Sequence, residues 1–105
     1  MANNNYFSHY TLGGLSPTDR AIAAGYPGCK VGTTVYSNYG IGENIFMEWG
    51  NLGTHSDIAH SAFNAWMNSS GHRANILDSY YVSEGIGCAI VGDRVYITED
   101  FCMPF

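Results

Sequence analysis

A chain of 105 residues in which 46% are apolar and 12% are charged has the composition of a folded domain, which excludes an intrinsically disordered segment. Its net charge of −5 and its four scattered basic residues exclude the basic surface of a nucleic-acid-binding protein: these are Arg20, Lys30, Arg73 and Arg94. The length of the chain predicts a single domain, residues 1–105. No apolar stretch is long enough to span a bilayer, so we expect no membrane span.

The first predicted element is a short helix over about residues 17–24. Ser16 is a typical N-cap, Pro17 suits the first helical position, Asp19 places an acid in the first turn, and Gly25 ends the helix. Residues 29–48 are rich in Gly, Tyr, Thr and Asn with some β-branched residues. We therefore expect loop and extended structure that leads into Glu43.

A second helix is predicted to begin at a Ser56-Asp57 cap and to end at residues 69–71. Its apolar residues recur at helical spacing and form one face: Ile58, Ala62, Phe63, Trp66 and Met67. The glycine at position 71 then breaks the pattern, and a third, short helical turn is expected after His72, through Leu77.

The last part of the chain predicts two antiparallel strands. Apolar residues alternate at 86, 88 and 90 and again at 95, 97 and 101, around a turn at Gly92-Asp93. Helices beside an antiparallel sheet predict an α+β fold.

The three cysteines, Cys29, Cys88 and Cys102, permit at most one internal disulfide. If Gly92-Asp93 forms a two-residue hairpin turn, Cys88 lies opposite Ile97 and Cys102 points to the other face of the sheet. On that register Cys88 and Cys102 cannot bond, whereas a turn one residue longer would reverse the parity. No cysteine has the spacing of a zinc or redox motif, and buried small hydrophobic residues are the favoured interpretation.

Four blocks of sequence resemble the signature of the CAP superfamily, and of its small bacterial members in particular. They are F-S-H at 7–9, D-R-x-x-x-A-G-Y at 19–26, G-E-N-I at 42–45 and W-M-N-S-x-G-H-R-x-N-I-L at 66–77, followed by a final aromatic strand that ends in D-F at 100–101. The resemblance implies an α-β-α sandwich. Members normally carry a helix before the F-S-H block, so this chain is expected to lack the family's first helix.

The resemblance also implies a cleft lined by two histidines and two acids. The matching positions here are His9, Glu43 and His72, while the position of the second acid falls on Ser69. His9, His72 and Glu43 would make an incomplete site for zinc or another divalent cation, because zinc takes four ligands. The alternative is a hydrogen-bonded pocket in which Glu43 is the buried partner of the histidines.

The other polar residues that we considered, inside and outside these blocks, are expected to have local roles. His55 and His60 flank the start of the second helix and are not expected to be ligands, and His60 is expected to be solvated. Arg73 is expected to pair with an acid or a helix carbonyl. Asn75 suits a cap or a loop clamp. A Ser69, His72 and Glu43 triad can be drawn, but the chain has no G-x-S-x-G motif to expose the serine.

Three functions follow as hypotheses. The first is a secreted, non-enzymatic CAP-domain module whose cleft binds a small ligand, a lipid or a metal; the second is a metal-assisted or serine-type hydrolase that uses the same cleft. The third is an interaction domain of a larger surface protein. The resemblance implies an extracellular or cell-surface location although residues 1–5 show no signal peptide. A homodimer is expected to cover the apolar surface that the missing helix would leave open.

Overall fold

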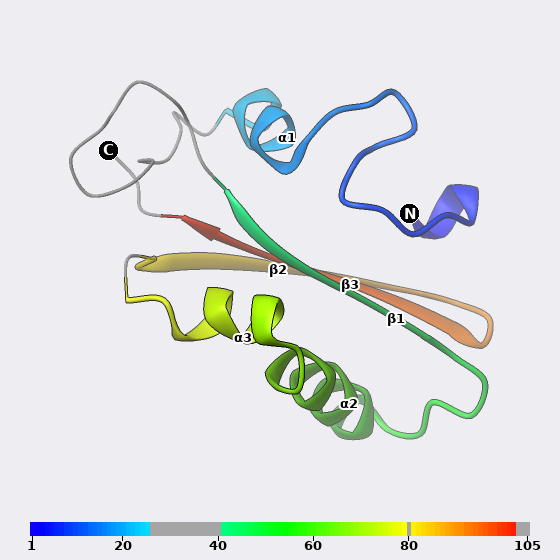
Figure 1. Ribbon diagram of the computed structural model, residues 1–105. Coiled ribbons are helices and arrows are strands. Elements are labelled where there is room, and N and C mark those ends of the chain that lie inside the picture. The colour runs from blue at the N-terminus through cyan, green and yellow to red at the C-terminus, as the bar shows by residue number, and fades with distance from the viewer. Residues whose placement is uncertain (26–40, 80, 103–105) are drawn as a thin grey trace.

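The computed structural model describes residues 1–25, 41–79 and 81–102, and these form a three-stranded antiparallel sheet with helices on both faces (Figure 1). This confirms the α+β class. In chain order the elements are η1 (Ala2–Asn4), α1 (Pro17–Ala23), β1 (Gly42–Trp49), α2 (His55–Met67), α3 (Ser70–Leu77), β2 (Ser83–Val91) and β3 (Arg94–Cys102).

Helix α1 begins and ends as the sequence predicts. The Ser16 side chain accepts a hydrogen bond from the Asp19 backbone N–H, and the Asp19 side chain accepts one from the Ser16 backbone N–H. This capping box satisfies two N–H groups that have no partner within the helix. Gly25 follows with a φ of +88°, a left-handed conformation that glycine adopts without strain.

Helices α2 and α3 differ from the prediction at their boundaries. The N-cap of α2 is Thr54, not Ser56, because Asp57 sits at the third helical position and closes a capping box with Thr54. The break between the helices falls at Asn68 and Ser69, so Gly71 lies inside α3 rather than at the break. His72 is therefore a residue of the first turn of α3.

The sheet has the strand order β1-β3-β2, so β3 is central and both of its neighbours are antiparallel to it. The predicted two-residue turn is confirmed: Val91 pairs with Arg94, and Gly92 has a φ of +61°. Cys88 lies opposite Ile97, as expected from that turn. Cys88 is a free, exposed thiol and Cys102 is disulfide-bonded, while Cys29 lies outside the described residues.

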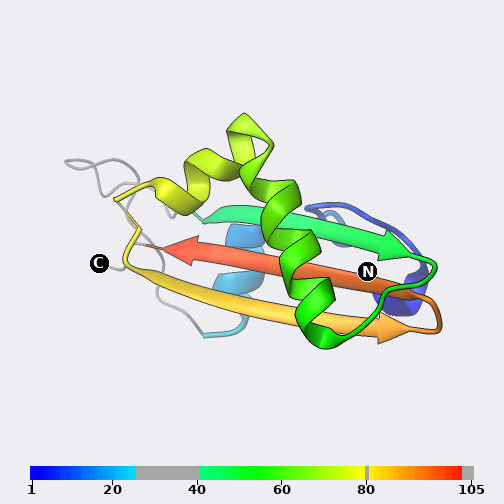
Figure 2. The same ribbon diagram turned by 90° about the horizontal axis from the view of Figure 1, so that it is seen from below.

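The core lies between the sheet and α2. It consists of Ile58, Ala62 and Trp66 from the helix and of Val95 and Ile97 from β3. Figure 2 looks onto this face and shows α2 crossing the strands, whereas α1 and the N-terminal segment lie on the opposite face in Figure 1. Because neighbouring residues of a strand point to opposite faces, each strand contributes to both sides.

The outer strand β2 carries apolar side chains that the described residues leave exposed. Ile86 is 61% exposed and Ile90 is 48% exposed, on the same face as α2. The homodimer expected from the sequence stays a prediction.

Candidate functional site

The candidate site is centred on Glu43, near the start of β1. Its neighbour Gly42 lies close to Tyr81, because a Cβ there would lie 2.7 Å from the Tyr81 hydroxyl oxygen, and a larger residue would require the Tyr81 ring to shift. The Tyr81 ring in turn stacks on Phe101, with 5.6 Å between ring centroids. In the G-E motif, the Gly42 backbone therefore lies close to the Tyr81 ring, and the Glu43 side chain points to the face of the sheet that α1 covers.

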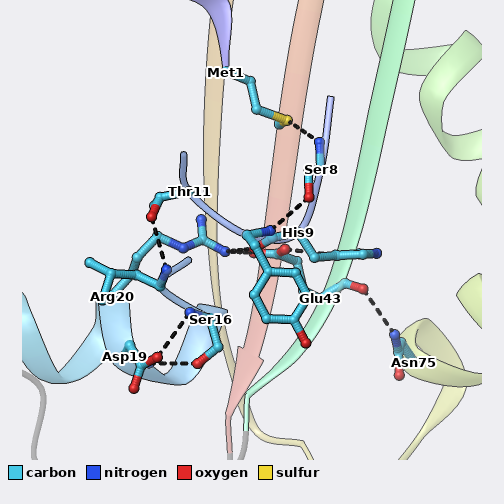
Figure 3. Close-up of polar contacts among 11 residues, drawn as sticks. Met1, Ser8, His9, Thr11, Ser16, Asp19, Arg20, Glu43 and Asn75 are labelled. Atoms are coloured by element: carbon cyan, nitrogen blue, oxygen red, sulfur yellow. Dashed lines mark hydrogen bonds and ion pairs between the residues drawn. The ribbon is translucent and has the colours of Figure 1, made fainter. Parts of the chain in front are cut away.

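The Glu43 carboxylate is buried and binds two basic side chains. Its Oε1 lies 2.7 Å from His9 Nδ1, and its Oε2 lies 2.7 Å from Arg20 Nη2. The Glu43 side chain is only 3% exposed, whereas that of His9 is 44% exposed and that of Arg20 is 33% exposed. Figure 3 shows all three side chains meeting, with His9 on the N-terminal segment and Arg20 on α1.

Arg20 also fixes the N-terminal segment that carries His9. Its Nη2 donates a hydrogen bond to the His9 backbone carbonyl at 2.9 Å. One guanidinium thus holds both the carboxylate and the backbone of the histidine that the carboxylate binds.

This arrangement decides which nitrogen of His9 carries the proton. A carboxylate can only accept hydrogen bonds, so His9 Nδ1 is the donor to Glu43. In the neutral ring, Nε2 then keeps its lone pair. Because the side chain is partly exposed, the site offers one oriented imidazole edge to solvent.

Asp100 completes the acidic part of the site from β3. It pairs directly with Glu43 across the two strands and hydrogen-bonds to it. Burial, followed by the hydrogen bond and charge of Glu43, raises the pKa of Asp100 from 3.8 to about 7, although Arg20 and His9 act in the opposite direction. A cavity of about 260 Å³ borders Asp100, and Ala21, Ala24 and Ile41 contribute apolar walls.

The next residue, Asn44, points to the other face of the sheet and connects it to α3. Asn44 is fully buried, and its Nδ2 donates to the His72 backbone carbonyl at 3.2 Å and to Glu99 Oε1 at 3.3 Å. Asn75 Nδ2 donates to Asn44 Oδ1 at 3.0 Å and to the Glu43 carbonyl at 3.4 Å, the second contact being visible in Figure 3. Asn75 is thus a clamp between α3 and β1.

A second pair of carboxyl groups lies on this face. Glu99 is buried on β3 and hydrogen-bonds to the exposed Glu84 of β2. Burial, and then the hydrogen bond and charge of Glu84, raise the pKa of Glu99 from 4.5 to about 7, while the bond from Asn44 lowers it. Glu99 and Asp100 therefore place one carboxyl pair on each face of β3.

The structure brings together two residues of the expected four-residue cleft, and the complete cleft stays a prediction. His9 and Glu43 meet on the α1 face, but His72 and Ser69 belong to the α3 side, because the side chain that reaches α3 is Asn44 and not Glu43.

Two of the three expected metal ligands, His9 and Glu43, are already bound to each other or to Arg20 in this arrangement. Both Glu43 oxygens and His9 Nδ1 are already engaged, and His72 lies across the sheet. Among residues 1–25, 41–79 and 81–102, no three His, Cys, Asp or Glu side chains lie close enough to hold a metal ion. Zinc binding itself stays a prediction, and we assign zinc no role here.

The other predicted polar residues lie away from the site. His60 is exposed on α2, as expected, and His55 and Arg73 are exposed as well. Sequence reasoning missed Arg20, Asn44 and Asp100 as site residues. A signal was present, since Arg20 follows Asp19 in the second block, Asn44 belongs to G-E-N-I, and Asp100 belongs to the final D-F.

The two raised pKa values predict that stability falls as pH rises towards neutrality. Each carboxyl binds its proton more tightly in the folded state, so its stabilising contribution is complete below about pH 4 and is lost as pH rises through about 7. We expect the free energy of unfolding to decrease by on the order of 2 kcal/mol between pH 5 and pH 8. Chemical denaturation at each pH measures it.

Glu99→Gln should flatten part of this dependence, because glutamine keeps an acceptor for Asn44 but cannot ionise. Glu48→Gln, at the other end of β1, is the matched control and should leave the pH profile unchanged. A Glu99→Gln profile as steep as that of the unmodified protein would contradict the assignment.

Comparison with known proteins agrees with the sequence blocks. The family model for CAP, the cysteine-rich secretory protein family, matches residues 1–102. The chain is 31% identical over 101 residues to the uncharacterized membrane protein YlbC of Bacillus subtilis (strain 168). The matched region covers 96% of this chain but only 23% of YlbC. The chain thus spans about a quarter of the length of this relative.

No solved structure matches the chain. Within the described residues, none of the helices has the length and apolar character needed to cross a membrane. The family match extends from the first residue to the end of β3 and includes every block around Glu43, so the chain belongs to the CAP, or cysteine-rich secretory protein, family.

Proposed function

We propose that this protein is a non-enzymatic binding module that recognises a hydrogen-bonding group of a small ligand on the α1 face of the sheet. The observation that carries the proposal is the His9–Glu43–Arg20 network, in which a buried carboxylate orients a partly exposed imidazole. A site of this kind can bind a ligand by one directed hydrogen bond through Nε2. Helices on both faces of the sheet support the family's α-β-α sandwich as its framework.

The surroundings of the network favour a small ligand. The cavity of about 260 Å³ beside Asp100 has apolar walls and a carboxyl group whose pKa is raised to about 7, chiefly by burial. A few polar groups in a mostly apolar cavity are typical of small-molecule sites.

We place this module outside the cytoplasm, as part of a larger surface protein. The disulfide at Cys102 supports an oxidising compartment. The relative YlbC is described as a membrane protein, and it is about four times as long as the matched region.

The proposal is tested by NMR titration of the histidine ring signals with three probes: sodium acetate, acetamide and zinc chloride. Acetamide carries N–H donors for the Nε2 lone pair, acetate can only accept a hydrogen bond and so tests for a protonated ring, and zinc chloride tests the lone pair as a metal ligand. We expect acetamide to shift the His9 signals in a saturable manner while the His60 signals stay constant, because of these two histidines only His9 is held by a buried carboxylate.

His9→Gln should remove the saturable response, and His60→Gln is the matched control that should retain it. Parallel responses of His9 and His60 to all three probes would show that His9 behaves as an ordinary surface histidine. The proposed site would then be rejected.

A further inference from the structure

A second hollow lies on the same face of the sheet, beyond the His9 site, where the N-terminal segment passes over the ends of β1 and β3. Its volume is about 460 Å³, inside the roughly 300 to 1,000 Å³ range of small-molecule sites. Its lining is unusually aromatic and also polar: Tyr6, Phe7, Trp49, Tyr96, Asp93 and Arg94.

Two of the aromatic rings in this hollow are open to solvent, whereas Tyr96 is buried. Trp49 is 67% exposed and Phe7 is 45% exposed. Trp49 pairs with Arg94 across β1 and β3, and Met47 pairs with Tyr96, so these four side chains project from one face of the sheet. The Trp49 indole ends a strand whose other residues are largely covered. It is a large exposed apolar surface, and the described residues show no structural role for it.

The outer wall of the hollow is fixed to its floor. The Asn5 Oδ1 accepts hydrogen bonds from Arg94 Nη1 and, at 3.5 Å, from the Tyr96 hydroxyl. On the opposite side, the Gly50 backbone N–H donates to the Asp93 carbonyl at 2.9 Å and holds the hairpin turn against the end of β1. The site is therefore built before any ligand binds, which lowers the entropic cost of binding.

We propose that this hollow is a carbohydrate site that takes a short, neutral oligosaccharide. Aromatic ring faces pack against the C–H faces of pyranose rings, and neighbouring hydroxyls need both acceptors and donors. Asp93 supplies carboxylate oxygens, and Arg94 has further N–H groups beyond the one bound by Asn5. Asp93 and the net charge of −5 disfavour an anionic ligand, and Arg94 disfavours a quaternary ammonium ion.

The test is NMR titration of the labelled protein with cellobiose, chitobiose and maltose, with choline chloride as a probe of the other ligand class. We expect at least one disaccharide to shift the backbone signals of residues 5–7, 49 and 93–96 at millimolar concentration. Trp49→Ala and Asp93→Ala should each weaken that binding by about tenfold or more. Both positions are exposed, so both variants should fold.

Phe63→Ala is the matched control, because Phe63 is an aromatic residue that is 50% exposed on α2, across the sheet. It should bind the disaccharide as the unmodified protein does. The proposal is overturned if no disaccharide binds, if choline alone binds, or if Trp49→Ala keeps full affinity. His9→Gln should leave sugar binding intact, so failure at one site does not decide the other.

Discussion

Replacing Trp66 with alanine should lower the free energy of unfolding by about 3 to 5 kcal/mol, the usual cost of truncating a large buried aromatic residue. Trp66 is 6% exposed at the centre of the core between α2 and the sheet. Its ring lies edge-on to Phe46, with 6.4 Å between centroids. Its Nε1 also donates to the Ile45 carbonyl at 3.0 Å, which fixes the helix against β1.

Urea denaturation followed by circular dichroism measures this loss. Trp66→Phe separates the two contributions, since phenylalanine keeps part of the packing but removes the hydrogen bond, and it should lose less than alanine does. Trp49→Ala is the matched control, with an expected change within about 0.5 kcal/mol because that indole is 67% exposed. Equal losses at positions 49 and 66 would contradict the described core.

Replacing Asn44 with alanine should cost about 2 to 4 kcal/mol, although it removes only a short polar side chain. The substitution removes one hydrogen-bond partner from the His72 carbonyl, the Glu99 carboxyl and the Asn75 amide. Glu99 keeps its bond to Glu84, and Asn75 keeps its bond to the Glu43 carbonyl. Buried polar groups that lose a hydrogen bond cost about 1 to 3 kcal/mol each, and partial relaxation reduces the sum. Thermal and chemical denaturation both report it.

Asn44→Asp gives a sharper result, because it places a further carboxylate beside Glu99. We expect it to be more destabilising at pH 8 than at pH 5, where protonated carboxyls can still share hydrogen bonds. Asn64→Ala, at an exposed position of α2, should change stability by less than about 0.5 kcal/mol. An Asn44→Ala variant as stable as Asn64→Ala would show that α3 does not depend on this hydrogen-bonded centre.

Secondary structure in this chain could be predicted well where local chemistry decides it. Ser16, Pro17 and Asp19 define the start of α1, and Gly92-Asp93 defines the hairpin and so the pairing of Cys88 with Ile97. The sequence pattern predicts the start of α2 two residues late, because Ser56 and Asp57 resemble a cap, whereas Asp57 is the third helical residue of a Thr54 capping box. Both positions suit an acid near a helix start, and only the backbone geometry distinguishes them.

The candidate site could be predicted only in part. The sequence blocks identified His9 and Glu43, which the structure brings within 2.7 Å. They also suggested His72, which belongs to the other face. A one-residue difference in strand position reverses the direction of a side chain, so the motif G-E-N sends Glu43 towards His9 and Asn44 towards α3.

The sequence by itself determined the family, the α+β class, the caps of α1, the hairpin and two members of the site, because these depend on local residue chemistry or on motifs with fixed spacing. Only the tertiary structure decided that Arg20 and Asp100 join Glu43 and that Glu99 pairs with Glu84. It also decided that Trp49 and Tyr6 share one hollow. These residues are distant in sequence, and their meeting depends on the strand order β1-β3-β2 and on which face of the sheet each helix covers, which no local pattern records.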